Sequence, residues 1–170
     1  MSSDDTTTDK INPASILGGM AARREEIIAS AHTDLRVPRW TDPEVFVRFA
    51  PVDHGVIRRG QVRVDKAPDK DKARVEVEAN SDLLAAACVG VFAVIDGKEY
   101  SLRPGDYDGA WTGFDDDLAE ALGMDPSART ARQVIKALYM FEPDIIKTAG
   151  DVVEFSGYVT NKSNERVTGE

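Results

Sequence analysis

The sequence contains few of the side chains from which active sites and metal sites are built. Its 170 residues include one cysteine, Cys88, and two histidines, His32 and His54. A hydrolytic triad needs a base beside a nucleophile, and neither histidine lies next to a Gly-x-Ser-x-Gly turn. Structural zinc needs several cysteine or histidine ligands at short spacing, which three scattered residues do not supply. We therefore expect no catalytic residues, no zinc and no cofactor.

Long apolar segments and an export signal are missing as well. The longest apolar run, residues 83–95, is shorter than the roughly 20 residues that a membrane-spanning helix needs. The first ten residues are mainly Ser, Thr and Asp, unlike the basic and then apolar start of a signal peptide. We expect a protein that is not exported by that route, does not enter a membrane and works in the cytoplasm.

The chain has fewer basic than acidic residues. The chain has 21 Lys and Arg residues against 30 Asp and Glu residues, a net charge of −9 at pH 7. Such a chain repels the phosphates of nucleic acids and anionic lipids. The basic stretch from Arg58 to Arg74 has the charge of a nucleic-acid patch, but it lacks interleaved aromatic residues and is more simply a solvated face. We expect no nucleic-acid partner.

An acidic stretch is the candidate site for calcium. Asp106, Asp108 and the run from Asp115 to Asp117 place five carboxylates within a dozen residues. An EF-hand loop needs a third acid and then a glycine at positions where this stretch has Ala110 and Trp111. The alternative is that the run of three aspartates caps a helix and compensates its dipole. We favour the cap and expect no metal.

The residues that are present indicate a folded, mainly helical protein. A hydrophobic fraction of 42% and a charged fraction of 30% are typical of globular domains, and 170 residues suit one core. We expect a single domain over residues 13–158, a disordered polar arm over residues 1–12 and a loose polar tail over residues 159–170. Asn12 and Pro13 begin a first helix, whose apolar stripe is predicted to dock on the core.

Residues 35–50 have the pattern of a β-hairpin. Apolar and polar residues alternate in two runs on either side of the turn-like sequence Thr41-Asp42-Pro43-Glu44. Asp53 then predicts the cap of a short helix that reaches about Lys66. Residues 62–64 also alternate as a strand, so both structures stay open for this segment.

The strongest helical pattern lies in the middle of the chain. From Leu83 onward, apolar residues recur at i, i+1, i+4, i+5, i+8, i+9 and i+12, which predicts a long central helix from Lys72 to Ile95. Residues 98–102 predict a short strand that extends the hairpin. Three further helices are predicted over residues 115–122, 129–141 and 143–157. The predicted fold is mainly α with a small antiparallel β-hairpin or three-stranded sheet, an α+β arrangement in which shorter helices pack on the long central helix.

Six short stretches between about residues 14 and 158 form an ordered series of sequence words. They are Leu35-Arg36-Val37-Pro38-Arg39-Trp40, residues 45–51, Glu78-Ala79-Asn80-Ser81-Asp82-Leu83-Leu84, Cys88-Val89-Gly90-Val91-Phe92, Phe114-Asp115-Asp116-Asp117-Leu118-Ala119 and Phe155-Ser156-Gly157-Tyr158. Together and in this order they resemble the tail assembly chaperones of long-tailed, non-contractile phages, particularly those of actinobacteria.

The resemblance implies a non-enzymatic protein that acts in the host cytoplasm during assembly and is absent from the mature virion. Such a chaperone binds the tape measure protein and keeps it soluble while subunits of the tail tube protein, a further expected partner, polymerise around it. Family members often also exist as a longer, frameshifted product. Two other classes stay open: a structural virion protein such as a head-to-tail connector, and a small enzyme of unfamiliar fold.

The expected client determines what a binding surface must offer. A tape measure protein is a very long helical protein with apolar stretches, so its chaperone needs an apolar surface that accepts a helix. Aromatic residues dominate binding energy at interfaces, and Trp40, Tyr139 and Phe141 are the candidate client anchors. The alternative for each of the three is a place in the core.

Charge is distributed unevenly along the chain. Residues 41–75 hold eight basic and six acidic residues, whereas residues 76–127 hold two basic and twelve acidic residues. If these segments face different sides, subunits can associate head to tail into a ring or spiral. The alternative is that the charges neutralise each other within one monomer. The candidate residues for this homo-oligomer are Arg58, Arg59, Arg63, Asp106, Asp108, Asp115, Asp116 and Asp117.

We predict that the isolated protein binds no metal ion in stoichiometric amount, because the ligand set of the acidic stretch is incomplete. A ligand that binds only the folded state raises the melting temperature. Adding a chelator should therefore leave the melting temperature unchanged in a thermal scan. A rise of several degrees on addition of calcium would contradict this prediction.

Overall fold

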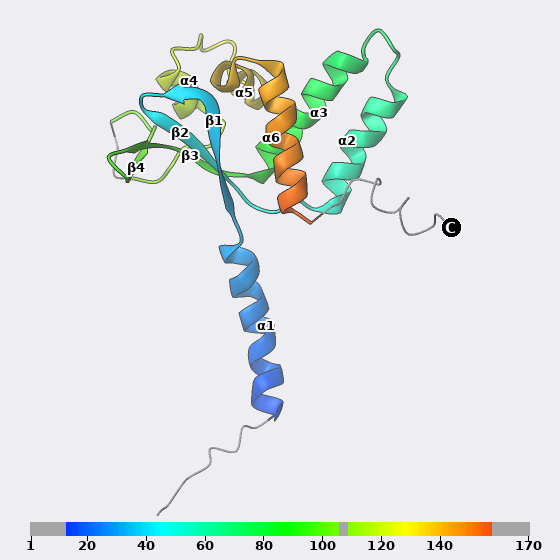
Figure 1. Ribbon diagram of the computed structural model, residues 1–170, viewed down its shortest axis with the longest axis vertical. Helices are drawn as coiled ribbons and strands as arrows, with labels where there is room; N and C mark the ends of the chain where they lie inside the picture. The colour runs from blue at the N-terminus through cyan, green and yellow to red at the C-terminus, as the bar shows by residue number, and fades with distance from the viewer. Residues whose placement is uncertain (1–12, 106–108, 158–170) are drawn as a thin grey trace, which may run out of the picture. The chain divides into compact units, whose positions relative to one another are not determined.

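The computed structural model describes residues 13–105 and 109–157 of the chain. Contacts divide the chain into two compact units, residues 1–31 and residues 32–170. Over the described residues, the first unit holds one helix and the second holds a four-stranded antiparallel sheet with five helices (Figure 1). In chain order the elements are α1 (Pro13–Ser30), β1 (Thr33–Thr41), β2 (Glu44–Phe49), α2 (His54–Lys66), α3 (Lys72–Ala87), β3 (Cys88–Ile95), β4 (Lys98–Ser101), α4 (Asp116–Ala121), α5 (Ala131–Tyr139) and α6 (Glu142–Phe155).

The predicted hairpin is confirmed by β1 and β2. The two strands pair antiparallel, with Leu35 opposite Val47. Along β2, Val45, Val47 and Phe49 are buried and alternate with more exposed residues, which is the period of two expected when one face of a sheet covers a core. The predicted strand near residue 98 is β4. The sheet has four strands in the order β1-β2-β3-β4, because a further strand that was not predicted lies between β2 and β4.

That further strand shows that the predicted central helix is wrong over its second half. α3 ends at Ala87, and Cys88–Ile95 forms β3, which pairs with β2 on one side and β4 on the other. A short run in which nearly every residue is apolar fits a buried strand as well as a helix, so its periodicity does not separate the two. Composition does: the β-branched residues Val89, Val91, Val94 and Ile95 favour a strand, and Gly90 disfavours a helix.

The segment after the hairpin is helical. α2 begins after Asp53, whose carboxylate accepts a hydrogen bond from the Gly55 backbone N at 3.1 Å. α2 lies beside α3 (Figure 1), and a Cβ added to Gly60 would lie 3.7 Å from the Cβ of Ala79. The predicted cap is confirmed, and residues 62–64 belong to this helix and not to a strand.

The three helices predicted near the C-terminus are confirmed as α4, α5 and α6, with ends within a few residues of those predicted. Asp115 caps α4 by accepting hydrogen bonds from the backbone N–H groups of Asp117 and Leu118. Thr130 and Gln133 form a reciprocal capping box at the start of α5. After α4 the chain reverses at Gly123, whose φ of 69° suits a residue without a Cβ.

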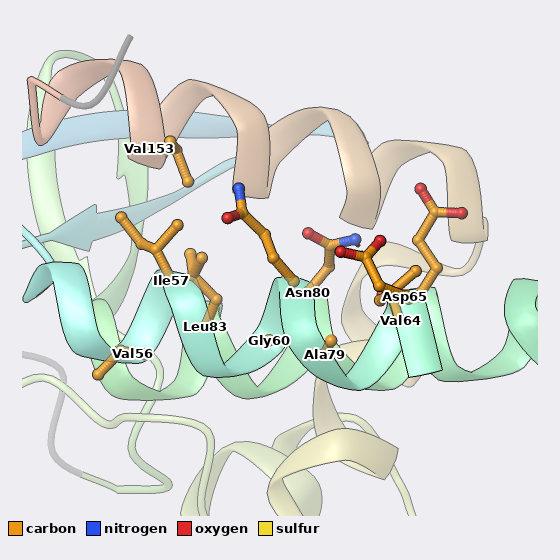
Figure 2. A pocket seen from close by; sticks show the side chains of 11 residues that line it. Val56, Ile57, Gly60, Val64, Asp65, Ala79, Asn80, Leu83 and Val153 are labelled. Carbon is orange, nitrogen blue, oxygen red and sulfur yellow. Dashed lines mark hydrogen bonds between the residues drawn. The ribbon is translucent and has the colours of Figure 1, made fainter. Parts of the chain in front are cut away.

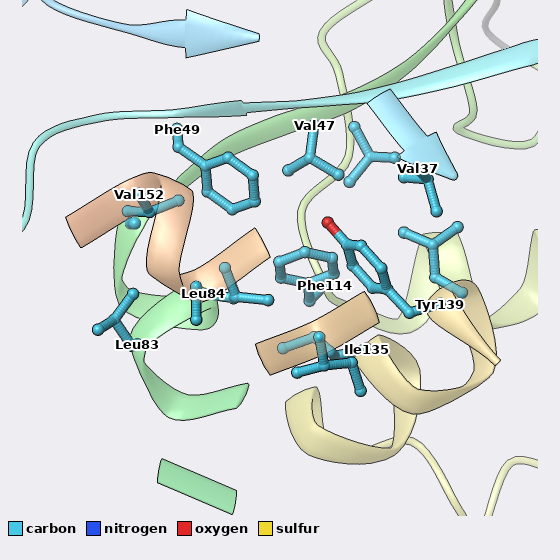
Figure 3. Close-up of a cluster of buried hydrophobic side chains, with 14 of the residues drawn as sticks. Val37, Val47, Phe49, Leu83, Leu84, Phe114, Ile135, Tyr139 and Val152 are labelled. Atoms are coloured by element: carbon cyan, nitrogen blue, oxygen red, sulfur yellow. The ribbon is translucent and has the colours of Figure 1, made fainter. Parts of the chain in front are cut away.

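One hydrophobic core joins the sheet to the helices. α3 packs against α5 and α6, and these helices cover one face of the sheet (Figures 1 and 3). The fully buried side chains with the largest volumes come from both layers. They include Val37, Val47, Phe49 and Val91 from the sheet and Leu84, Ile135, Leu138, Tyr139 and Ile145 from the helices.

The opposite face of the sheet is covered by an aromatic stack. The Phe92 ring lies between Phe46 and Trp111, with ring centroids 5.7 Å and 4.2 Å away. The Arg48 guanidinium lies 4.6 Å from the Trp111 ring centroid, and its Nε donates to the Asp34 carboxylate at 2.7 Å. Trp111 and its neighbours thus shield Phe92, which is buried although it lies on the outer face.

Helix α1 is confirmed as a helix, but its apolar face is exposed. Ile16, Leu17, Met20, Ile27 and Ile28 have exposed fractions of 50–68%. The docking of this stripe on the core and the single domain over residues 13–158 stay predictions.

Substitution of Gly90 tests the contact between β3 and Trp111. An added Cβ would lie 2.9 Å from the Trp111 Cβ, so Gly90→Ala should lower the free energy of unfolding by about 1–3 kcal/mol. Gly150→Ala in α6 is the matched control. Nothing lies within 4 Å of its added Cβ, and alanine favours a helix over glycine by up to about 1 kcal/mol. Chemical denaturation should give opposite signs for the two variants; equal effects would mean that Trp111 does not close over Gly90.

Candidate functional site

The described residues contain no arrangement typical of a metal centre or a reactive thiol. No group of three or more His, Cys, Asp or Glu side chains lies close enough together to hold a metal ion within residues 13–105 and 109–157. Burial raises the pKa of the Cys88 thiol to about 12, so it is not a thiolate at neutral pH. No helix among the described residues is long and apolar enough to cross a membrane.

The acidic stretch is partly used inside the protein. Burial raises the pKa of Asp115, but the hydrogen bonds that its carboxylate accepts from the Thr112 hydroxyl and from backbone N–H groups together outweigh burial and lower the pKa below its ordinary value. Asp117 pairs with Arg103 at 3.0 Å, and Asp116 is exposed. Asp106 and Asp108 lie outside the described residues. The predicted cap is confirmed for Asp115, and the role of this stretch in self-association stays a prediction.

The basic stretch also has internal partners. Arg63 pairs with Asp82 at 2.9 Å, and Arg132 of α5 donates to the same carboxylate at 2.7 Å. The resulting network ties α2, α3 and α5 together. Arg58 and Arg59 are exposed on α2, and neither forms an ion pair within the part of the chain that the structure describes. Of the three predicted basic residues, these two keep their charge free for a partner.

The three candidate client anchors differ in exposure. Tyr139 is fully buried between the helices and the sheet, where Figure 3 shows its hydroxyl pointing toward the strands that carry Val37 and Val47. Tyr139 is therefore a core residue, which was the alternative to a client anchor, and it offers no surface to a client. Trp40 is half-buried, and its indole Nε1 donates to the Leu138 carbonyl at 2.9 Å. Phe141 is 51% exposed.

Met140 lies beside Phe141 and was not predicted. It joins α5 to α6 with φ 66° and ψ −37°, and the Phe141 backbone N donates to the Tyr139 carbonyl at 2.8 Å. These features describe a γ-turn centred on Met140, a strained conformation that glycine adopts more readily. The Met140 side chain is nonetheless 48% exposed. No periodicity in the sequence marks it, because its position depends on this turn.

Arg39 fixes the exposed phenyl ring. Its guanidinium carbon lies 4.5 Å from the centroid of the Phe141 ring, and its Nε pairs with Asp144 at 3.1 Å. Trp40, the next residue of β1, is held against the end of α5 by its bond to Leu138. We call Trp40, Met140 and Phe141 the α5–α6 patch. Two of the three predicted anchors, Trp40 and Phe141, thus lie at the junction of α5 and α6, where Met140 is a further exposed apolar residue.

Comparisons with known proteins give no assignment. No protein-family model matches the chain, and no curated protein or solved structure is similar to it.

The ion pairs of Asp82 predict acid sensitivity. Hydrogen bonds from Arg132 and Arg63 lower the pKa of Asp82 below its ordinary value of 3.8. A carboxylate with a lowered folded-state pKa stabilises the protein above about pH 4, and this stabilisation is lost as the pH falls through the folded-state pKa. Asp82→Asn should lower the free energy of unfolding at neutral pH by about 1 kcal/mol or less, because Asp82 and its arginine partners are partly exposed. In this variant the free energy of unfolding should also fall less steeply as the pH becomes acidic.

The control for Asp82→Asn is Glu120→Gln, an exposed residue of α4 without an ion pair among the described residues. Urea denaturation at several pH values should separate the two variants. If the free energy of unfolding falls equally steeply with acidic pH in the wild type and in Asp82→Asn, the ion-pair network does not stabilise the fold.

Proposed function

We propose that this protein is a phage tail assembly chaperone that binds the tape measure protein and keeps it soluble while tail tube subunits polymerise around it. It acts in the host cytoplasm and is absent from the mature virion. The proposal rests on the ordered resemblance of the six sequence stretches and on one structural observation, the exposed α5–α6 patch.

The chemistry of the patch suits an apolar helical client. Aromatic side chains and methionine are enriched in the cores of protein interfaces, and methionine adapts to irregular apolar surfaces. Met140 and Phe141 present about half of their side-chain area to solvent. Such a surface can accept the apolar face of a helix, whereas a catalytic site would need titratable groups that the patch lacks.

The patch is also held in place before a client binds. Arg39 stacks on Phe141, Asp144 holds Arg39, and the γ-turn projects Met140 away from the core. A rigid anchor loses little conformational entropy on binding. Strain in a γ-turn costs stability, and strained backbone is concentrated at functional sites, which supports a role for Met140 outside folding.

The net charge of −9 supports the same role. A chaperone that holds an aggregation-prone chain must keep the complex dispersed. Like charges on bound copies repel neighbouring complexes, and a net charge far from zero favours solubility.

Substitutions in the γ-turn can separate client binding from folding. Met140→Gly removes an exposed apolar side chain and relieves the turn, so it should raise the free energy of unfolding by about 1 kcal/mol. The same variant should leave several-fold less tape measure protein in the soluble fraction when the two are co-expressed. Phe141→Ser should also reduce the soluble fraction.

Tyr139→Phe is the matched control for these variants. The Tyr139 hydroxyl is buried without a hydrogen-bond partner among the described residues, so its removal should leave both stability and client solubility close to wild type. If Met140→Gly and Phe141→Ser hold the client as well as the wild type does, the α5–α6 patch is not the client surface. Detection of the protein in purified virions would favour the connector class instead.

A further inference from the structure

Helix α1 lacks the local features that keep a helix folded on its own. Gly18 and Gly19 lie in its interior, each costing up to about 1 kcal/mol relative to alanine. The helix has no acidic residue in its first turn and no basic residue in its last turn, so its dipole is uncompensated. Isolated helices of this length are marginal in water. Its stability must therefore come from packing of the apolar face described above.

The second unit contains an open groove that suits such a helix. It has a volume of about 450 Å³ and runs along α2, between α3 and α6. Figure 2 shows Ile57, Leu83 and Val153 at one end and Asp65 at the other. Glu76 of α3 also lines the groove. The groove is thus apolar at one end, and its lining also includes the carboxylates of Asp65 and Glu76.

The apolar and basic residues of α1 match this pattern in spacing. Leu17 and Arg24 are seven residues apart, or about 10 Å along a helix, and Ile57 and Asp65 are eight residues apart, or about 12 Å. With Leu17 at the apolar end, Arg24 reaches the acidic end. Arg23 and Arg24 have only exposed partners within α1, Glu26 at 3.1 Å and Glu25 at 3.4 Å, and such pairs contribute little.

In the parallel register set by Leu17 and Arg24, covalent geometry keeps α1 out of the groove of its own chain. In this register α1 runs parallel to α2, so its last residue lies beyond the acidic end of the groove. The strand that follows starts at the other end, because Thr33 pairs with Phe49, and the segment after Phe49 is bonded to the ends of α3 and α6: Ala50 N donates to the Ala87 carbonyl and Val52 N to the Ser156 hydroxyl. Two linking residues, 31 and 32, span at most about 10 Å and cannot return along α2.

We infer that α1 of one copy lies in the α2–α3–α6 groove of a second copy, with Leu17 and Met20 on its apolar end and Arg23 and Arg24 facing Asp65 and Glu76. The contact is heterologous, because helix and groove are different surfaces, so it continues from copy to copy or closes into a ring. It does not involve the α5–α6 patch, and it holds whether or not the proposed client is correct.

Charge reversal on each side tests this contact in the full chain. Arg23→Glu with Arg24→Glu places acids against the acidic end of the groove, and Asp65→Arg with Glu76→Arg places bases against basic α1. Each double variant alone should lose association and scatter light as a single chain of 18.5 kDa. An equimolar mixture of the two should associate again, because every helix then meets a groove of opposite charge. Circular dichroism of each variant checks that the second unit remains folded.

Cross-linking tests the register. In a Cys88→Ala background, a chain with Met20→Cys mixed with a chain with Gln61→Cys should form a disulfide-linked dimer under mild oxidation. Ala22→Cys, on the opposite side of α1, should form several-fold less. Lys147→Glu, which alters an exposed charge of α6 outside the groove, should leave association unchanged.

Several results would overturn the inference. These are a wild-type chain that stays monomeric at high concentration, association that survives both charge reversals, or a mixture of reversed chains that fails to associate. Loss of association only in Arg58→Glu with Arg59→Glu would assign the contact to the basic stretch. An intrachain disulfide in a chain that carries both Met20→Cys and Gln61→Cys, without cross-linking between chains, would place α1 in its own groove.

Discussion

The direct change from helix to strand at Ala87 and Cys88 is the constraint on which the second unit depends. The Cys88 backbone N still donates to the Leu84 carbonyl as the cap of α3, while the Ala87 carbonyl accepts from Ala50 at the end of the hairpin. No loop separates the two layers, so the direction of α3 and the direction of β3 determine each other. α5 and α6 then pack on α3 over the buried face of the sheet. Both candidate surfaces are placed by these contacts.

The α5–α6 patch and the groove are formed by different parts of this arrangement of sheet and helices. The patch lies where β1 meets the junction of α5 and α6: Trp40 bonds to Leu138 of α5, and Arg39 pairs with Asp144 of α6. The groove is formed by helices alone, since α2 lies beside α3 and α6 contributes Val153. The proposed client surface and the proposed self-association surface therefore share no residue. A chain built in this way can bind a client and a second copy at the same time.

The sequence predicts those parts of the fold that local chemistry decides. Asp53 and Asp115 as caps and the alternation around residues 41–44 each have a local physical cause, and the structure confirms them. The boundary at Ala87 has no signal in the hydrophobic periodicity, because an apolar run keeps its hydrophobic face under either period. The β-branched residues after it favour a strand, but one partner of β3, strand β2, lies about 45 residues away. Among the site residues, Phe141 and Tyr139 are both aromatic at the end of one helix. Only tertiary packing places one in solvent and the other in the core, and only the γ-turn exposes Met140.

The most direct test of the proposed function is a pull-down of the tagged full-length protein from cells that also make the tape measure protein of the same phage, with both proteins quantified by mass spectrometry. The proposal predicts that the tape measure protein is recovered as the main partner, with several copies of the small protein on each long client. Recovery of the small protein alone, while the tape measure protein remains in the insoluble fraction, would contradict it.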